Sequence, residues 1–151
     1  MKVFIINPDN KELCSVEEWK KDVDPTRAKY IVLELDDGER RMYYKNKLRN
    51  EKGSERFTWA DALKAAEGFR EDGLDGWRIE SRREALDCAG DAWDIFPEAV
   101  RLIGGDIVDG VFWTREIRSN SYNAWIFYGD YGYLHHSYRY NPYAVRVFRP
   151  F

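Results

Sequence analysis

The sequence predicts an α+β fold, with two main helices beside a short-stranded antiparallel sheet. Capped helical segments occupy residues 59–69 and 81–88, and β-rich runs bounded by turn residues occur on both sides of them. Sequential short strands joined by polar turns form antiparallel sheets, against which neighbouring helices pack. The 151 residues are enough for one well-filled core, so we expect a single domain over residues 1–151.

The first fifty residues predict strands and one short helix. Residues 3–6 are β-rich and end at a turn cluster. Ser15 and Glu18 have capping-box spacing, which predicts a short helix after Ser15. Residues 30–35 and 40–44 flank an Asp-Gly pair. Because glycine supplies the positive φ of a tight turn, these two runs predict a hairpin.

Three helical segments are predicted in the middle of the chain. Residues 46–56 are polar and predict an exposed connection, after which Thr58 caps a helix over residues 59–69. Ser81 begins a second Ser-x-x-Glu capping box and therefore a second helix. A third helical piece is predicted over residues 97–102, where a Gly-Gly pair follows.

Four short strands are predicted after the helices, at residues 111–113, 124–128, 132–134 and 144–148. Large aromatic side chains dominate protein cores, so tryptophans within apolar patterns are expected to be core residues. Four tryptophans fit this description: Trp59, Trp77, Trp113 and Trp125.

Arginine is enriched near the end of the chain. Four arginines and one acid follow Ile117, so this region is locally positive. Arginines among tyrosines suit bidentate contacts to an anionic ligand, and the alternative is that two of the four are structural. We expect Arg78 and Arg146 to hydrogen-bond Glu84, Glu116 or backbone carbonyls, because a buried guanidinium needs its donors satisfied.

Tyrosine is also concentrated in this region. Residues 112–151 hold seven of the ten tyrosines, both histidines and no lysine. Tyrosine gives a large contact area with few rotors to freeze, and Ser, Asn and Asp add adaptable hydrogen bonds. We therefore expect a receptor- or adhesion-type surface for a protein or glycan ligand, made of Arg118, Ser119, Asn120, Ser121, Tyr122, Asn123, Tyr128, Asp130, Tyr131, Tyr133, His135, Ser137, Tyr138, Arg139, Tyr140 and Asn141.

Strand alternation gives this surface a predicted geometry. Residues two apart lie on the same face of a strand, so Tyr131, Tyr133 and His135 are expected to be exposed together, with Tyr138 and Tyr140 extending the patch. Such a patch marks an interaction site. The first alternative is a structural or assembly module that uses the same tyrosines for homo-oligomer contacts.

The two histidines do not predict catalysis. Adjacent residues on a strand point to opposite faces, so His135 and His136 do not chelate a metal together. No Ser-His-Asp or Cys-His spacing is evident, and Asp106, Asp109 and Asp130 are too dispersed for a calcium site. We expect no catalytic residue, metal site or cofactor. The second alternative, a small enzyme using His135 or His136, predicts a cleft with a nearby acid.

Composition bounds the partners and the place of action. A net charge of -3 argues against a general nucleic-acid binder, which needs a clustered basic face. Near the first residue the apolar run is too short for a signal peptide or a membrane span. Synthesis in the cytosol is expected, with a virion or exported surface left open. Cys14 and Cys88 are expected to be buried thiols, with a disulfide as the alternative.

Six motifs in one order carry a resemblance to a known family. They are Phe57-Thr58-Trp59 with Ala62; Gly76-Trp77-Arg78-Ile79 with Ser81, Glu84 and Leu86; Phe112-Trp113-Thr114 with Glu116; Ala124-Trp125 with Phe127; Gly132; and Val145-Arg146 with Arg149. The series is similar to the Lcl C-terminal (Fib-succ major paralogous) domain family. Its fold is C-type-lectin-like and related to the formylglycine-generating-enzyme scaffold.

The resemblance covers residues 57–151 and implies a ligand face. In such domains the segment corresponding to residues 115–143 is exposed on a constant frame. In the most similar relatives it is the hypervariable region of diversity-generating retroelement variable proteins, which makes diversification here a hypothesis. The resemblance implies attachment or receptor recognition on a phage or bacterial surface. Glu80 departs from the family, which has proline there, while Ser81 keeps the hydroxyl cap.

Overall fold

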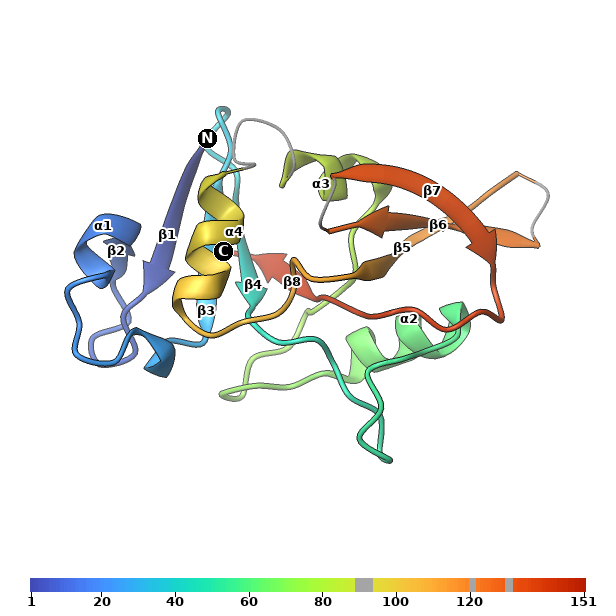
Figure 1. Cartoon of the computed structure of the whole chain (residues 1–151), viewed down its shortest axis with the longest axis horizontal. Coiled ribbons are helices and arrows are strands. Elements are labelled where there is room, and N and C mark those ends of the chain that lie inside the picture. The colour runs from blue at the N-terminus through green and yellow to red at the C-terminus, as the bar shows by residue number, and fades with distance from the viewer. Residues whose placement is uncertain (89–93, 120–121, 130–131) are drawn as a thin grey trace.

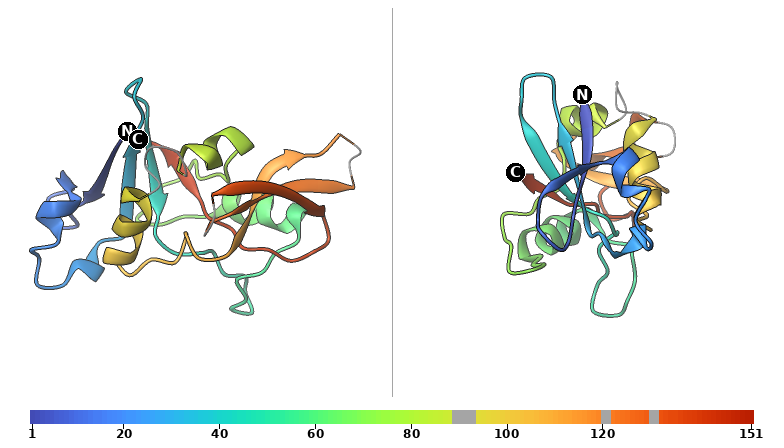
Figure 2. Two further views of the ribbon diagram at one scale, coloured as in Figure 1. Left: turned by 45° about the horizontal axis from the view of Figure 1, so that its top comes forward. Right: turned by 90° about the vertical axis from the view of Figure 1, so that its left-hand side faces the viewer.

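The structure, a computed structural model, describes residues 1–88, 94–119, 122–129 and 132–151. Within them the chain is α+β, as predicted, and its sheets are antiparallel. The described residues form four α-helices, which correspond to the two main helices and the two shorter helical pieces that were predicted, but they form two separate sheets where one was predicted. The two sheets lie toward opposite ends of an elongated molecule (Figures 1 and 2).

The large sheet has five strands in the order β2-β1-β3-β4-β8. It contains the predicted first strand and the predicted hairpin. β2 was not predicted. At the hairpin turn Gly38 has a φ of 89°, as the Asp-Gly pair predicted. The strands are β1 (Lys2–Ile6), β2 (Leu13–Ser15), β3 (Tyr30–Glu34), β4 (Arg40–Tyr44) and β8 (Phe148–Pro150).

The helices confirm most of the predicted starts. They are α1 (Val16–Trp19), α2 (Trp59–Gly68), α3 (Arg82–Asp87) and α4 (Ile95–Leu102), with a 3₁₀ turn η1 (Pro25–Arg27). The Ser15 hydroxyl accepts from the Glu18 amide at 3.1 Å, and Ser81 forms both bonds of its capping box with Glu84. Thr58 is the N-cap residue of α2, as predicted, but its side chain makes no cap hydrogen bond.

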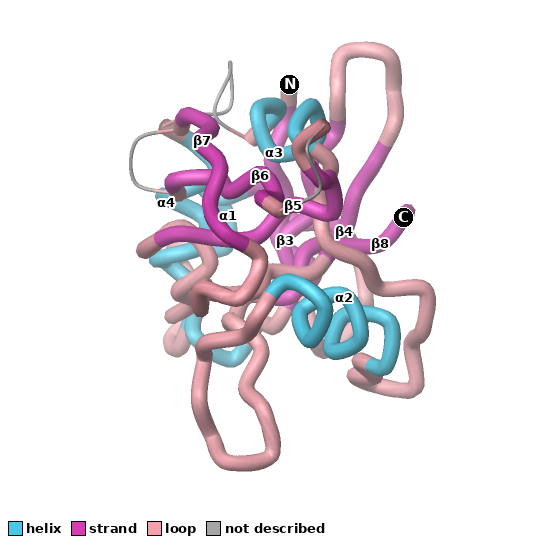
Figure 3. The backbone as a smooth tube through the Cα atoms, turned by 90° about the vertical axis from the view of Figure 1, so that its right-hand side faces the viewer, coloured by secondary structure: helices cyan, strands magenta, loops and turns pink. Residues whose placement is uncertain are grey.

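The small sheet has three strands in the order β5-β6-β7. They are β5 (Val111–Ile117), β6 (Asn123–Tyr128) and β7 (Tyr133–Tyr138), and β5 is longer than predicted. Trp113 pairs with Ile126 and Ile117 with Ala124, so the register shifts between them. Looking onto this end of the molecule, Figure 3 shows the small sheet between α3 and α2.

The predicted strand at residues 144–148 is largely wrong. Only Phe148 belongs to β8, because the preceding residues leave the small sheet and cross to the large one. Ala144 bridges to Phe112 of β5, and the Val145 carbonyl accepts from the Leu48 amide at 3.0 Å. Leu48 is therefore buried within the connection that was predicted to be exposed. Residues 139–147, between β7 and β8, form the closing segment, which joins the two sheets.

Alternation in the large sheet separates two cores. One face packs against α4, which contacts β1 and β3, and the other face packs toward α2 and the small sheet. Residues of the first face include Val3, Ile5, Ile31, Leu33 and Tyr43. Residues of the second include Ile6, Tyr30, Val32 and Met42. Both faces are covered, which explains why β3 reads as a continuous apolar run.

A buried ion pair joins the closing segment to the frame. The Arg146 guanidinium donates to both carboxylate oxygens of Glu80, from Nε at 2.5 Å and from Nη2 at 3.2 Å. Tyr43 donates its hydroxyl to Glu80 at 2.7 Å. Arg146 also donates to the Ile107 carbonyl, so the predicted backbone carbonyl partner is present, but its acid is Glu80 and not the predicted Glu84 or Glu116. Arg78 is exposed and lies over the Phe148 ring.

The cysteines and tryptophans are only partly as predicted. Both thiols are free; Cys88 is buried, whereas Cys14 is half-buried. Burial, with a smaller contribution from Glu80, raises the pKa of Cys88 to about 12. Trp77 and Trp113 are core residues, but Trp59 and Trp125 are half-buried. Both half-buried rings support the surface described next.

Candidate functional site

The predicted ligand-binding residues gather on the β6–β7 hairpin and its two flanks. Arg118 and Ser119 follow β5, and Arg139, Tyr140 and Asn141 follow β7. Between them the hairpin carries Asn123, Tyr128, Tyr133, His135, Ser137 and Tyr138. Four predicted residues, Asn120, Ser121, Asp130 and Tyr131, lie outside the described part of the chain.

The hairpin register places the predicted side chains on two opposite faces. Trp125 pairs with His136, and Ile126 pairs with His135. Because side chains alternate along a strand, Tyr133 and His135 share the face of Ile126, which packs toward α2. Tyr138 lies with His136 on the other face. The prediction that Tyr138 extends the Tyr133 face is therefore wrong, since the two positions differ by an odd number of residues.

Exposed tyrosines nevertheless lie on both faces of this outer hairpin and at its ends. The relative exposures are 68% for Tyr122, 50% for Tyr133, 47% for Tyr138 and 64% for Tyr140. Tyr133 stacks on Tyr128 with ring centroids 4.9 Å apart, and Tyr138 contacts Tyr140 at 5.1 Å. β7 is the edge strand of the small sheet. Tyrosines are therefore exposed on both sides of this strand.

His136 is held by a polar network on the α3 side of the hairpin. The Arg118 guanidinium lies 2.8 Å from Nε2 of His136, and the Asn123 side-chain amide lies 3.1 Å from Nδ1. The Trp125 ring meets the imidazole edge-on at 5.7 Å. Partial burial, followed by the charge of Arg118, lowers the pKa of His136. At neutral pH the imidazole is therefore uncharged and can accept from Arg118.

The first turn of α3 contacts this network through Trp125. The Arg82 guanidinium lies 4.6 Å from the centroid of the Trp125 ring, a cation–π contact. Its Nε donates to Glu116 at 3.0 Å, and its backbone amide donates to the same carboxylate at 2.8 Å. The Ser81 capping box fixes the start of α3. Trp125 is therefore clamped between the helix and the hairpin, which restricts its rotamers.

The other end of the hairpin is fixed by hydrogen bonds to the closing segment. Ser137 Oγ and the Tyr143 hydroxyl are 2.8 Å apart, and Asn141 donates its amide to Ser137 at 3.0 Å. The Trp59 amide donates to the Arg139 carbonyl at 2.9 Å, and the Arg139 guanidinium lies 5.9 Å from the Trp59 ring centroid. Ser137, Arg139 and Asn141 therefore also support the surface, a role that the prediction did not give them.

The four C-terminal arginines divide into separate roles. Arg146 is buried in its pair with Glu80, and Arg149 donates to the Asp75 carbonyl at 2.7 Å. Arg118 and Arg139 belong to the hairpin region and contact His136 and Trp59 respectively. The alternative reading, in which two of the four are structural, therefore describes Arg146 and Arg149.

The two histidines contact each other and the groups around them. The His136 ring contacts Arg118, Asn123, Trp125 and the His135 ring, and Nδ1 of His135 lies within hydrogen-bond distance of the His136 backbone. Across residues 1–88, 94–119, 122–129 and 132–151, no group of three His, Cys, Asp or Glu side chains is placed to hold a metal ion.

Comparison with known proteins adds no family to this description. No protein-family model matches the chain, and no curated protein matches it. Among the helices that the structure describes, none is both long and apolar enough to cross a membrane.

Several supporting residues were missed by sequence reasoning. Arg82 and Glu116 hold Trp125, yet neither was predicted to belong to the site. A half-buried tryptophan beside a histidine on the paired strand was the available signal, because cross-strand neighbours interact directly. The pairing of Trp125 with His136 depends on the register of the β6–β7 hairpin. Turn length sets this register, and the sequence alone did not fix that length.

Proposed function

We propose that this chain is a non-enzymatic ligand-binding domain of receptor or adhesion type, which recognises a protein or glycan through the β6–β7 hairpin. The observation that carries the proposal is the set of exposed tyrosines on that hairpin and its flanks, Tyr122, Tyr133, Tyr138 and Tyr140. Aromatic side chains exposed on a rigid element supply contact area at low entropic cost.

Preorganisation supports this function. His136, Trp125 and Arg82 contact one another in series from the hairpin to α3, and Ser137 joins the far end of β7 to Tyr143 by a hydrogen bond. A surface held in this way loses less conformational freedom when a ligand binds. The neutral, hydrogen-bonded His136 acts as a support for the exposed tyrosines around it.

The finer fold assignment belongs to the same proposal. We propose that residues 1–151 form a single C-type-lectin-like domain, in which residues 57–151 carry the family resemblance, on the strength of the motif order and the antiparallel α+β architecture. Diversification of residues 115–143 follows as part of this hypothesis. Sequencing the locus tests it: a near-repeat of this segment beside a reverse transcriptase supports diversification, and a locus without either contradicts it.

The binding proposal is tested by screening the purified chain on glycan and surface-protein arrays. The test variant is Tyr133→Ala/Tyr138→Ala/Tyr140→Ala, which removes tyrosines from both faces of the hairpin. Phe151→Ala is the matched control, because Phe151 is also an exposed aromatic residue, at 50%, but lies beside β4 and outside the hairpin. We expect a signal that the triple variant loses and the control keeps. A signal that the folded triple variant retains contradicts the proposal.

One observation favours a second candidate, a subunit-assembly module. β7 is an edge strand, and edge strands present unpaired backbone groups that another chain can extend. Sedimentation equilibrium of the wild type and the triple variant separates the two functions. Self-association that the triple variant abolishes, without any array signal, favours assembly over ligand recognition.

A further inference from the structure

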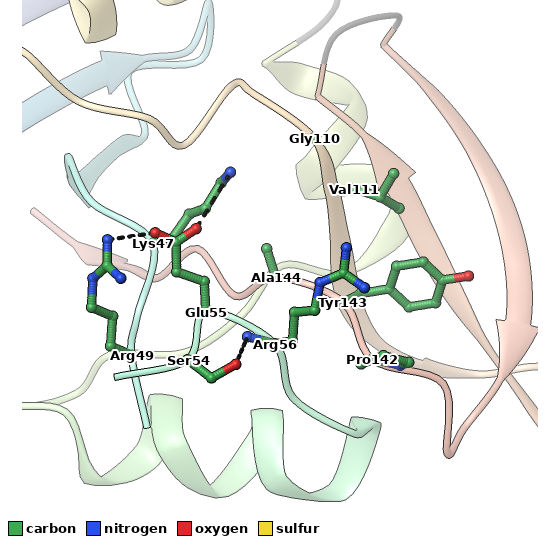
Figure 4. A pocket seen from close by; sticks show the side chains of 10 residues that line it. All are labelled: Lys47, Arg49, Ser54, Glu55, Arg56, Gly110, Val111, Pro142, Tyr143 and Ala144. Atoms are coloured by element: carbon green, nitrogen blue, oxygen red, sulfur yellow. Dashed lines mark hydrogen bonds and ion pairs between the residues drawn. The ribbon is translucent and has the colours of Figure 1, made fainter. Parts of the chain in front are cut away.

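A cavity of about 550 Å³ lies apart from the exposed tyrosines. One wall is the connection between β4 and α2, which supplies residues of the 47–56 segment, and the other is formed by residues 110–111 and 142–144. Figure 4 shows the Arg56 side chain reaching from the first wall toward Val111 and Tyr143 on the second. The volume is in the range of about 300–1,000 Å³ that small-molecule sites occupy.

The cavity is positively charged although the chain is acidic. Lys47, Arg49 and Arg56 line it together with a single acid, Glu55, which leaves an excess of two positive charges. The whole chain, by contrast, has a net charge of -3. Cationic side chains that converge on a concave surface concentrate anions there.

Glu55 neutralises mainly one of these three cations. Its carboxylate lies 2.5 Å from Arg49 and 3.9 Å from the Lys47 ammonium. The longer separation is outside hydrogen-bond range, although the Lys47 side chain is only 15% exposed. Within the described residues Lys47 Nζ donates no hydrogen bond, and it lies 5.8 Å from the centroid of the Phe112 ring. A sheltered ammonium with free donors is suited to an additional anionic partner.

Arg56 supplies a second cation with free donors. Its backbone amide donates to Ser54 at 3.1 Å, whereas its guanidinium makes no hydrogen bond or ion pair with any described residue. A guanidinium presents paired donors whose spacing matches a carboxylate or a phosphate. Because Arg56 is exposed at the mouth of the cavity, a ligand reaches it without displacing another side chain.

The opposite wall is apolar and held in place. Val111, Pro142, Tyr143 and Ala144 form it. The Tyr143 ring meets Trp113 edge-on at 5.0 Å, and its hydroxyl is bonded to Ser137. A ligand therefore meets cations on one side and a fixed apolar surface on the other, which suits a small molecule with a charged group and a less polar body.

We propose that this cavity binds a small ligand through an oxyanion, a phosphate or a carboxylate, held between Lys47 and Arg56. The Glu55–Arg49 pair fixes the wall, and the Tyr143 side packs against the rest of the ligand. This site is separate from the tyrosine-bearing hairpin and does not depend on the function proposed for it.

Titration by ¹H–¹⁵N NMR at constant ionic strength tests the proposal, with inorganic phosphate and glucuronate as probes. We expect saturable shifts at the amides of Lys47, Arg56 and Val111 with at least one probe. Saturation by phosphate alone assigns a phosphate site, and saturation by glucuronate alone assigns a carboxylate site. The absence of saturable shifts with both probes overturns the proposal.

Charge-removing variants distinguish a built site from general anion attraction. Lys47→Gln/Arg56→Gln removes the two proposed contacts, and Lys21→Gln/Arg83→Gln removes the same charge from exposed side chains elsewhere. We expect the first variant to raise Kd at least about tenfold, as the loss of a charge-assisted hydrogen bond predicts, and the control to leave it within about twofold. Equal weakening in both variants, or binding retained in the first, overturns the site.

The single variant Arg56→Gln provides a check that does not depend on buried groups. Because its guanidinium is exposed and makes no hydrogen bond or ion pair with a described residue, this change is expected to leave the fold intact. It is expected to raise the Kd of the probe that binds by about tenfold. The Tyr133→Ala/Tyr138→Ala/Tyr140→Ala variant is expected to bind the probe normally, so failure of either proposal is recognised independently of the other.

Discussion

Replacing Glu80 by glutamine is expected to destabilise the fold strongly. Glu80 is 3% exposed and Arg146 is 1% exposed, so the substitution leaves a buried guanidinium without its counter-charge. Breaking one side of a buried ion pair costs about 3–5 kcal/mol of unfolding free energy. The Tyr43 hydroxyl also loses its carboxylate acceptor, which lies 2.7 Å away in the native chain.

The predicted loss is measurable by thermal and urea unfolding. At about 2–4 °C per kcal/mol for a chain of this size, the melting temperature falls by about 6–20 °C. Glu67→Gln is the matched control, since Glu67 is exposed on α2 and its carboxylate has no partner among the described residues. Surface substitutions of this kind stay within about 0.5 kcal/mol of the wild type.

A double variant separates an uncompensated charge from lost packing. Glu80→Leu/Arg146→Met removes both charges and keeps the core filled. We expect it to be more stable than Glu80→Gln, because replacing a buried pair with apolar groups of similar volume is often neutral or favourable. The assigned role of this pair is refuted if Glu80→Gln lowers the free energy of unfolding by less than about 1 kcal/mol. It is also refuted if the double variant is less stable than both Glu80→Gln and the wild type.

Three further predictions follow from local geometry. Gly129→Ala is expected to lower the free energy of unfolding in urea by about 1–3 kcal/mol, because the new Cβ would lie 2.8 Å from the Val108 carbonyl oxygen. In Gly68→Ala the new Cβ meets nothing within 4 Å, so this control is expected to be neutral or stabilising, and equal effects of the two variants would contradict the prediction. Ser81→Ala removes the acceptor of the capping box at the start of α3 and is expected to cost about 1 kcal/mol; an unchanged melting temperature would contradict the assigned cap. The pKa of His136, measured by NMR, is expected to lie below the ordinary value of about 6.5. Its contribution to stability is therefore present above that pH and is lost as the pH falls through the folded-state pKa. Arg118→Gln is expected to raise this pKa toward the ordinary value, and a wild-type pKa at or above about 6.5 would show that the assigned network is absent.

Local signals in the sequence predicted the elements better than their pairing. The Ser15 and Ser81 caps and the Gly38 turn are each set by residues within four positions of one another, and all three are present. Residues 144–148 were predicted as one strand, but only Phe148 belongs to a strand, because pairing here depends on β4, about a hundred positions earlier. Likewise, a buried Arg146 required an acid, but only tertiary proximity selects Glu80.

The candidate site shows the same division. Composition predicted an exposed tyrosine-bearing surface near the end of the chain, and in the structure Tyr133 and Tyr138 are about half exposed. The separation of Tyr133 and Tyr138 onto opposite faces was already contained in the odd number of residues between them. The cavity beside Arg56 was missed, because it forms only where a connection that looked featureless meets the closing segment.

The affinity of the hairpin for its ligand tests the central claim most directly. For the strongest array signal, Kd is measured by surface plasmon resonance for the wild type, for Tyr133→Ala/Tyr138→Ala/Tyr140→Ala and for Phe151→Ala. Truncation of interface tyrosines at hot spots predicts a combined loss of at least about 3 kcal/mol, or more than about 100-fold in Kd. The account predicts that loss in the folded triple variant alone, and a triple variant that binds within about threefold of the wild type would contradict it.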